Sequence, residues 1–225
     1  SPIAYWVSEK FRESFQKFRP LREFGTTRLG MTTANNSIFT RIWSEVSEKN
    51  FFRNAKNEEE FHFNQKKWVP YNKGGIFRKW YGNLDHILNW ENNGHLIKTY
   101  GTETGNIRST VPNTEFYFLE CVTWSKISSS KPSFRYRPPG SIFDVAGACI
   151  FSNQEVLPIL CSLLNSFVSR TILAVLSPTL NFEGGQISRI PVPTGGTLQH
   201  LNNNYSCLVS YAKADWDSYE TSWDF

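Results

Sequence analysis

The sequence has 225 residues, a formal net charge of +4 at pH 7 and an ordinary globular composition, with 40% hydrophobic and 20% charged residues. This length fits one large domain or two small ones, which bury enough surface to fold without disulfides or metals. The sequence has no long apolar run, no Cys-x-x-Cys pair and no signal peptide. We therefore expect a cytoplasmic protein with no membrane span and four buried, free thiols.

An amphipathic helix is predicted at the beginning of the chain, where apolar residues recur at intervals of three and four. The positions in this pattern are Ile3, Val7, Phe11, Phe15 and Phe18. The pattern ends before Pro20, because proline disrupts a helix interior. The apolar face can pack against the rest of the chain or bind a partner.

A polar loop rich in Gly, Thr and Asn is predicted at residues 29–37, before an alternating strand at residues 38–46. Thr33, Asn35 and Asn36 are candidate DNA-binding residues, because short polar side chains and free backbone amides bind phosphates and base edges. A purely structural turn is the alternative for this loop.

A basic and aromatic stretch follows a polar segment at residues 53–65, which is predicted to be a surface linker. No acid occurs in residues 66–79, and Gly74-Gly75 predicts a turn. Cations bind phosphates, while aromatic and amide groups add packing and base-edge contacts, so the stretch indicates a nucleic-acid surface. The alternative is a hairpin with its rings in the core and its lysines in solvent. The candidate DNA-binding residues here are Lys66, Lys67, Lys73, Arg78, Lys79, Tyr81 and Asn83.

A second acid-free basic segment covers residues 121–143, where two predicted strands flank a hydroxyl-rich loop. Arg135 and Arg137 share one strand face, because alternate residues of a strand point the same way. We expect these two, with Arg78, to read guanine through bidentate hydrogen bonds. Trp124 can stack on a base or belong to the core. The candidate DNA-binding residues of the segment are Trp124, Ser125, Lys126, Ser128, Lys131, Arg135 and Arg137.

The remaining predicted elements complete an α+β fold with a mixed or antiparallel sheet, an N-terminal helix and a helical segment. In chain order the predictions are strands at 86–90, 116–125, 134–140 and 141–151, a loop at 99–114, one or two packed helices at 155–176 and a last helix at 205–225. Asn165 marks a break in the helical segment, and Pro178 ends it.

No catalytic motif is found in the sequence. Pro138-Pro139 lacks the following aromatic residue with which adenine methyltransferases hold a flipped base. A glycine-rich loop for S-adenosylmethionine, a phosphate-binding loop and an Asp-x-Lys or Glu-x-Lys pair are also missing. The four histidines lack the spacing of metal ligands. We therefore expect no catalysis, cofactor or metal in this chain.

An ordered series of segments resembles the C-terminal target-recognition region of the PglX-like adenine-specific DNA methyltransferases of bacterial BREX phage-exclusion systems. The segments are SPIAYWVS at 1–8, the 29–41 loop with its final Arg41, YNKGGIFRKWYGN at 71–83, NWENNG at 89–94, TWS at 123–125, FDVAG at 143–147 and the Pro-x-Pro exit at 178–193. The series is also similar to the specificity domains of type IIG (type IIL) restriction-modification enzymes. The chain departs from the family pattern at Met31, Ala34, Asn35 and Val122.

The resemblance implies a connecting helix at 1–20, a DNA target-recognition domain at 21–195 and the start of a further helical segment at 196–225. It implies a non-catalytic role in which the chain positions duplex DNA for N6-adenine methylation by a separate domain of the same bacterial polypeptide. S-adenosylmethionine would bind to that separate domain, and other phage-defence subunits are candidate partners. Two rivals are a protein-interaction module of the phage-defence complex and, less favoured, a carbohydrate-binding module. Salt distinguishes DNA binding from both rivals, because the affinity for DNA falls steeply as the salt concentration rises.

Overall fold

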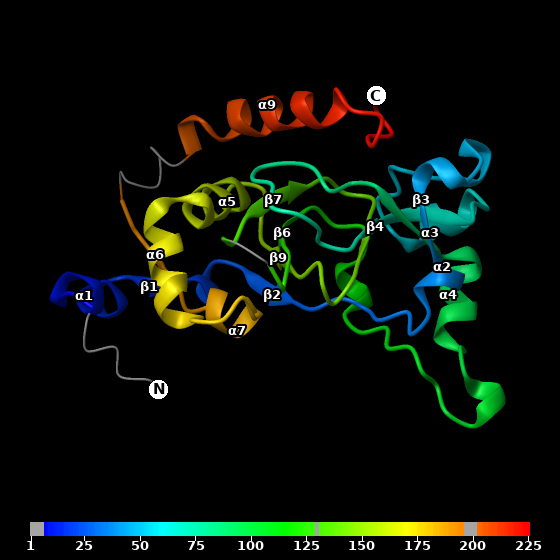
Figure 1. Ribbon diagram of the computed structural model, residues 1–225, viewed down its shortest axis with the longest axis horizontal. Coiled ribbons are helices and arrows are strands. Elements are labelled where there is room, and N and C mark those ends of the chain that lie inside the picture. The colour runs from blue at the N-terminus through cyan, green and yellow to red at the C-terminus, as the bar shows by residue number, and fades with distance from the viewer. Residues whose placement is uncertain (1–6, 129–130, 196–201) are drawn as a thin grey trace.

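Two four-stranded sheets form the centre of the computed structural model, which describes residues 7–128, 131–195 and 202–225 (Figure 1). The first sheet has the antiparallel order β2 (Thr26–Arg28), β9 (Cys149–Phe151), β6 (Cys121–Trp124) and β7 (Phe134–Arg137). The second has the order β3 (Thr40–Ile42), β5 (His86–Asn89), β4 (Trp68–Asn72) and β8 (Ile142–Phe143), with β4 and β8 parallel. A two-stranded sheet pairs β1 (Arg19–Pro20) with β10 (Pro191–Val192). The predicted α+β class with mixed and antiparallel sheets is confirmed.

The helices fall into two groups and one long C-terminal helix, as Figure 1 shows. Beside the first sheet lie α5 (Leu157–Asn165), α6 (Phe167–Leu176) and α7 (Gly184–Ile187), while α1 (Glu9–Lys17) lies farther out, next to β1. Beside the second sheet lie α2 (Asn36–Phe39), α3 (Glu58–Phe63) and α4 (Glu91–Lys98). The C-terminal helix is α9 (Tyr205–Asp217), and short 3-10 turns occur at Leu21–Glu23, Trp43–Glu45, Glu48–Asn50, Thr102–Thr104 and Thr114–Phe116.

The first sheet is a middle layer with a hydrophobic core on each face. Because alternate residues of a strand point to opposite faces, Val122 and Trp124 of β6 join a core with Leu160 and Leu164 of α5. Cys121 of the same strand belongs to a second core, which also contains Tyr71, Trp90, Phe118 and Phe143. This double coverage leaves the inner strands of the first sheet no solvent-facing side.

The predicted helical segment is confirmed as the pair α5 and α6, and the break falls at Ser166, next to the predicted Asn165. Ser166 caps α6 by accepting a hydrogen bond from the Ser169 amide at 3.1 Å. The two helices are bent by 73° at this break. Together they are long and apolar enough to cross a membrane, but no single helix among the described residues is.

Asparagine caps explain two predictions that are wrong. Asn35 accepts a hydrogen bond from the Ile38 amide at 3.3 Å and begins α2, which occupies the start of the strand predicted at 38–46. Asn57 accepts from the Glu60 amide at 2.8 Å and begins α3 inside the predicted 53–65 linker. In α3 the first turn consists of three glutamates, which interact favourably with the positive end of a helix dipole.

Two further corrections concern the strand at 141–151 and the cysteines. The predicted single strand is divided into β8 and β9, because Asp144 accepts a hydrogen bond from the Ala146 amide at 2.8 Å and closes a turn. All four cysteines are free, as predicted, but Cys207 on α9 is exposed and not buried. The predicted helix at the beginning of the chain is confirmed at Glu9–Lys17, and residues 1–6 lie outside the described part.

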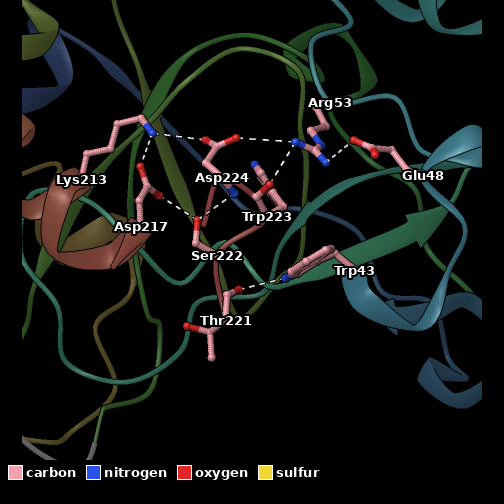
Figure 2. A network of polar contacts seen from close by, with 9 residues as sticks. All are labelled: Trp43, Glu48, Arg53, Lys213, Asp217, Thr221, Ser222, Trp223 and Asp224. Carbon is pink, nitrogen blue, oxygen red and sulfur yellow. Dashed lines mark hydrogen bonds and ion pairs between the residues drawn. The ribbon is translucent and has the colours of Figure 1, made fainter. Parts of the chain in front are cut away.

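The C-terminal segment connects α9 to residues 43–53 beside the second sheet, as Figure 2 shows. Trp43 donates its indole hydrogen to the Thr221 carbonyl at 3.0 Å, and Arg53 donates to the Trp223 carbonyl at 3.1 Å. Arg53 also pairs with Glu48 at 2.6 Å and with Asp224 at 3.6 Å, while Lys213 pairs with Asp217 and Asp224. These contacts tie the C-terminal segment to a part of the chain about 170 residues earlier.

Candidate nucleic-acid interface

The three candidate DNA-binding stretches meet at one turn, residues 144–147, which we call the junction turn. The Val145 amide donates to the Met31 carbonyl at 3.0 Å, so the junction turn contacts the stretch at 29–37. The Asp144 amide donates to the Asn72 carbonyl at 2.9 Å, which connects the turn to the basic and aromatic stretch. The Lys126 amide donates to the Ala146 carbonyl at 2.9 Å, which adds the third stretch. The fold thus joins segments that are far apart in the sequence.

Buried polar groups and glycines fix this junction. The Asn72 side chain is buried and donates to Thr123 at 2.6 Å and to the Gly147 carbonyl at 2.8 Å. A Cβ atom at Gly147 would lie 2.4 Å from the Asn72 carbonyl oxygen, and one at Gly74, where φ is +81°, 2.8 Å from the Ala146 oxygen. The backbones therefore approach too closely for any side chain at these two positions.

Tyr71 and Asp144 form a buried polar pair beneath the junction turn. The Tyr71 hydroxyl donates to an Asp144 carboxylate oxygen at 2.7 Å. Burial, followed by the nearby Asp144 carboxylate, raises the pKa of Tyr71 well above its usual value. The hydroxyl consequently remains a proton donor throughout the ordinary pH range.

The loop at residues 73–83, which we call the tip loop, presents two apolar side chains to solvent. Ile76 is 73% exposed and Phe77 is 47% exposed. Ser125 donates to the Gly75 carbonyl at 2.8 Å, and Asn83 donates to the Ile76 carbonyl at 2.9 Å. Ser125 and Asn83 are candidate DNA-binding residues that the structure buries and uses to hold the tip loop.

Arg135 and Arg137 are fully buried, so the prediction that they reach base edges does not fit this structure. They do share one face of β7, as expected, but the tip loop covers that face. Arg135 donates to the Arg78 carbonyl and to Ser125, both at 3.3 Å, and Arg137 donates to Ser141 at 3.2 Å. Burial lowers the pKa of Arg135 to about 10, with repulsion from Arg137 adding to it, and burial lowers the pKa of Arg137 to about 10.

Three other candidates in the tip loop contact neighbouring helices. Arg78 forms an ion pair with Asp215 of α9 at 2.8 Å, and its guanidinium lies 5.0 Å from the centre of a Trp216 ring. Lys79 donates to the Asn165 carbonyl at 2.7 Å, and burial, with repulsion from Arg170 and Lys131, lowers its pKa. The Tyr81 ring is buried, with the Lys213 ammonium 5.5 Å from its centre, and burial raises the pKa of the Tyr81 hydroxyl.

The lysines differ in how far other groups neutralise them. Lys67 pairs with Glu91 at 3.7 Å, and Lys126 pairs with Glu183 at 3.1 Å. Lys66 and Lys67 precede β4, whereas Lys73 follows it, so the first two lie at the opposite end of the strand from the tip loop. Among the described residues, none of Lys73, Lys79 and Lys131 forms an ion pair with a carboxylate.

The remaining candidates divide between the core and the surface. Trp124 is completely buried and donates its indole hydrogen to the Phe182 carbonyl at 2.8 Å, which favours the core alternative. Thr33 is buried and donates to Asn36 at 2.8 Å, while Asn36 itself is exposed. Ser128 donates to the Lys131 carbonyl at 3.3 Å, and residues 129–130 between them lie outside the described part.

Two arginines near this surface were not among the predicted residues. Arg41 lines a surface pocket of about 420 Å³ together with Asn36, Lys73 and His86. Its guanidinium donates to the Ser37 carbonyl at 2.5 Å. Arg170 of α6 lies close enough to Lys79 to lower the pKa of that lysine. The sequence could have identified Arg41 as a candidate, because it is the final residue of the family pattern at 29–41. It gave no such indication for Arg170, which stands alone in an apolar helix sequence.

Among the described residues, no group of three or more His, Cys, Asp or Glu side chains is placed to hold a metal ion. The polar groups at the junction turn are already paired with one another or with backbone. The surface around the tip loop offers cations, amides and exposed apolar side chains, which are groups that bind phosphates and pack against bases.

Comparison with known proteins supports the predicted resemblance. No family model matches the chain. Over its whole length the chain is 42% identical to the adenine-specific methyltransferase PglX of Lacticaseibacillus casei (strain Zhang), of which it covers 19%. It is 36% identical over its whole length to the adenine-specific methyltransferase BrxX of Escherichia coli O9:H4 (strain HS), of which it covers 17%. The chain thus spans less than a fifth of the length of these curated relatives, and its similarity to PglX-like methyltransferases is confirmed.

Proposed function

We propose that this chain is the DNA-recognition part of a PglX-like adenine-specific DNA methyltransferase in a bacterial phage-defence or restriction-modification system. It holds duplex DNA in register, while a separate domain of the same cytoplasmic polypeptide binds S-adenosylmethionine and transfers the methyl group to adenine. The chain itself contributes no catalytic group. Its partners are then double-stranded DNA and the methyltransferase domain.

The observation that supports this proposal best is the convergence at the junction turn, combined with the whole-length similarity to two adenine-specific methyltransferases. Within the described part of the chain, Lys73, Lys79 and Lys131 form no ion pair with a carboxylate, so their charges are available to a polyanion. A lysine ammonium is a point charge, which suits phosphate contacts better than base reading. The Lys79 ammonium is held in place by its hydrogen bond to the Asn165 carbonyl. Asn36, which is exposed, and Arg41, which is half-buried, line the same pocket as Lys73 and carry groups that suit base-edge contacts.

A salt titration tests the proposal. The 225-residue chain is expected to bind duplex DNA of random sequence, and with about four to six phosphates neutralised, log K should fall against log salt with a slope of roughly −4 to −5. Fluorescence anisotropy of a labelled duplex over a range of salt concentrations gives the slope. A slope near zero would exclude this chain as a DNA-binding domain.

Single lysine variants show whether the assigned surface carries the binding. Replacing Lys73, Lys79 or Lys131 by alanine should each reduce the steepness of the slope by about one. Lys10, which is exposed on α1, provides the matched control and should leave the slope unchanged when it is replaced by alanine. Equal effects of all four substitutions would mean that DNA binds elsewhere or only through net charge.

A protein-docking role is the second candidate, supported by exposed apolar side chains at the beginning of α6. Phe167 is 71% exposed and Val168 is 60% exposed, and the Arg170 guanidinium lies 4.7 Å from the centre of the Phe167 ring. Binding through such a surface depends on apolar contact and changes little with salt. A partner whose affinity is insensitive to salt and lost in Phe167→Ser would favour this role.

A further inference from the structure

Exposed apolar side chains lie in and near the tip loop, close in sequence to lysines that have no carboxylate partner among the described residues. Ile76 and Phe77 project from this loop, and Ile127, which is 73% exposed, lies two residues after the Ser125 that bonds the loop. Lys73 and Lys79 flank Ile76 and Phe77 in the sequence, and Lys131 follows Ile127. Exposing several large apolar side chains together opposes the hydrophobic effect, so such a cluster indicates a binding surface.

The tip loop is held rigidly from beneath by the buried β7 arginines. Arg135 bonds the Arg78 carbonyl and Ser125 at 3.3 Å, and Arg137 reaches the Asn83 carbonyl at 3.5 Å. Neither guanidinium group forms an ion pair with a carboxylate of the described residues, so their burial carries a large desolvation cost. The result is a loop whose backbone is fixed at both ends and whose exposed side chains have a defined direction.

The surrounding charge selects the kind of partner. An apolar protein surface would leave Lys73, Lys79 and Lys131 near it without counter-charges, whereas duplex DNA supplies phosphates on both sides of its stacked bases. Proteins that bend DNA insert apolar side chains between base pairs and hold the flanking phosphates with cations. Ile76 and Phe77 have the size for such an insertion, and Gly74 and Gly75, at φ values of +81° and +124°, let the backbone turn sharply before them.

We propose that Ile76 and Phe77 form a wedge that inserts between neighbouring base pairs of the bound duplex and unstacks them. This proposal rests on the proposed function, because it requires that DNA binds at the tip loop. Lys73, Lys79 and Lys131 hold the phosphates around the insertion. Arg135 and Arg137 act as positioning residues that keep the wedge pointing outward.

Chemical probing of the bound DNA tests the wedge. The 225-residue chain is mixed at saturating concentration with a pool of random-sequence duplexes, which are treated with permanganate for unstacked thymines and chloroacetaldehyde for unpaired adenines and cytosines. The chain should raise the reactivity of bound duplexes several-fold over free DNA. The double variant Ile76→Ser, Phe77→Ser should return the reactivity to the level of free DNA while the salt slope stays unchanged.

The control is a double variant that removes two exposed apolar side chains elsewhere. Phe63 of α3 and Leu96 of α4 are exposed, and Phe63→Ser, Leu96→Ser should leave the reactivity as it is with the original chain. If the original chain binds DNA with the expected salt slope but produces no reactivity, or if the Ile76 and Phe77 variant retains it, the wedge is wrong and the proposed function stands. If no salt-dependent DNA binding occurs at all, the proposed function fails and the wedge fails with it.

Discussion

Replacing Trp216 by alanine tests whether α9 is an integral support of the tip loop. The Trp216 ring is 5% exposed and packs in a cluster with Tyr81 and Leu84. It also lies under the Arg78 guanidinium, at 5.0 Å from the ring centre. Through these contacts α9 covers the end of the tip loop that leads back into β5.

The expected loss of stability follows from two destabilising effects and one stabilising effect that partly offsets them. Truncating a buried tryptophan to alanine costs about 3–5 kcal/mol in core sites, and losing the contact with Arg78 adds about 0.5–1 kcal/mol. In the other direction, the Trp216 indole nitrogen is buried without a hydrogen-bond acceptor among the described residues, and its removal returns about 1–3 kcal/mol. The net loss should be about 2–4 kcal/mol, since the cavity term dominates.

Urea unfolding followed by far-ultraviolet circular dichroism measures this loss, because the signal does not depend on the removed tryptophan. Two matched variants separate the contributions. Trp216→Phe keeps an aromatic ring without the unpaired N–H and should cost less than half as much as Trp216→Ala. Asp215→Asn removes the partly exposed ion pair with Arg78, which is worth at most about 1 kcal/mol at such a site. A loss below about 1 kcal/mol in Trp216→Ala would refute the reasoning, because α9 would then not be docked on the tip loop.

Three further predictions concern the junction turn and the cysteines. Gly147→Ala should lower the thermal midpoint of unfolding, because its Cβ would lie 2.4 Å from the Asn72 carbonyl oxygen and overpacking costs about 1–3 kcal/mol. Gly185→Ala is the control and should not lower the midpoint, because no atom lies within 4 Å of a Cβ at that position. Burial raises the pKa of the Cys161 thiol to about 12, so the folded state retains a proton that the unfolded state loses above about pH 8.5. The contribution of this thiol to the free energy of unfolding is complete below that pH, and it falls by about 1.4 kcal/mol per pH unit above it. Urea unfolding at pH 8 and pH 10 should accordingly show a smaller alkaline loss in Cys161→Ala than in Cys207→Ala, and equal losses would contradict the assigned burial. Under native conditions a thiol reagent should label one cysteine rapidly, Cys207, and label all four after unfolding; rapid labelling of a second thiol would contradict the packing of the first sheet.

Local patterns in the sequence predicted those parts of the fold that depend on neighbouring residues alone. The spacing of apolar residues located α1, α5 and α6, and the alternation in Phe134–Arg137 placed Arg135 and Arg137 on one face of a strand. Side-chain direction in a helix or strand follows from backbone geometry, so these predictions needed no partner. The resemblance to PglX-like methyltransferases was likewise carried by ordered residues in the sequence and is confirmed by the whole-length matches.

Tertiary structure alone decided which of those faces are covered. Arg135 and Arg137 were predicted to face DNA, but the tip loop folds back across β7 and buries them. One contact between the loop and the strand is the hydrogen bond from the Trp80 amide to the Phe134 carbonyl, at 2.9 Å. Charge is a poor guide to exposure here, because serine hydroxyls and the Arg78 carbonyl accept hydrogen bonds from these guanidinium groups inside the fold. One nitrogen of each group, Arg135 Nε and Arg137 Nη2, is still buried without a hydrogen-bond partner among the described residues. Whether a residue is buried depends on segments that are distant in sequence, which local patterns do not reveal. The polar residues around Ile76 and Phe77 hold the tip loop, and these two apolar side chains are left exposed.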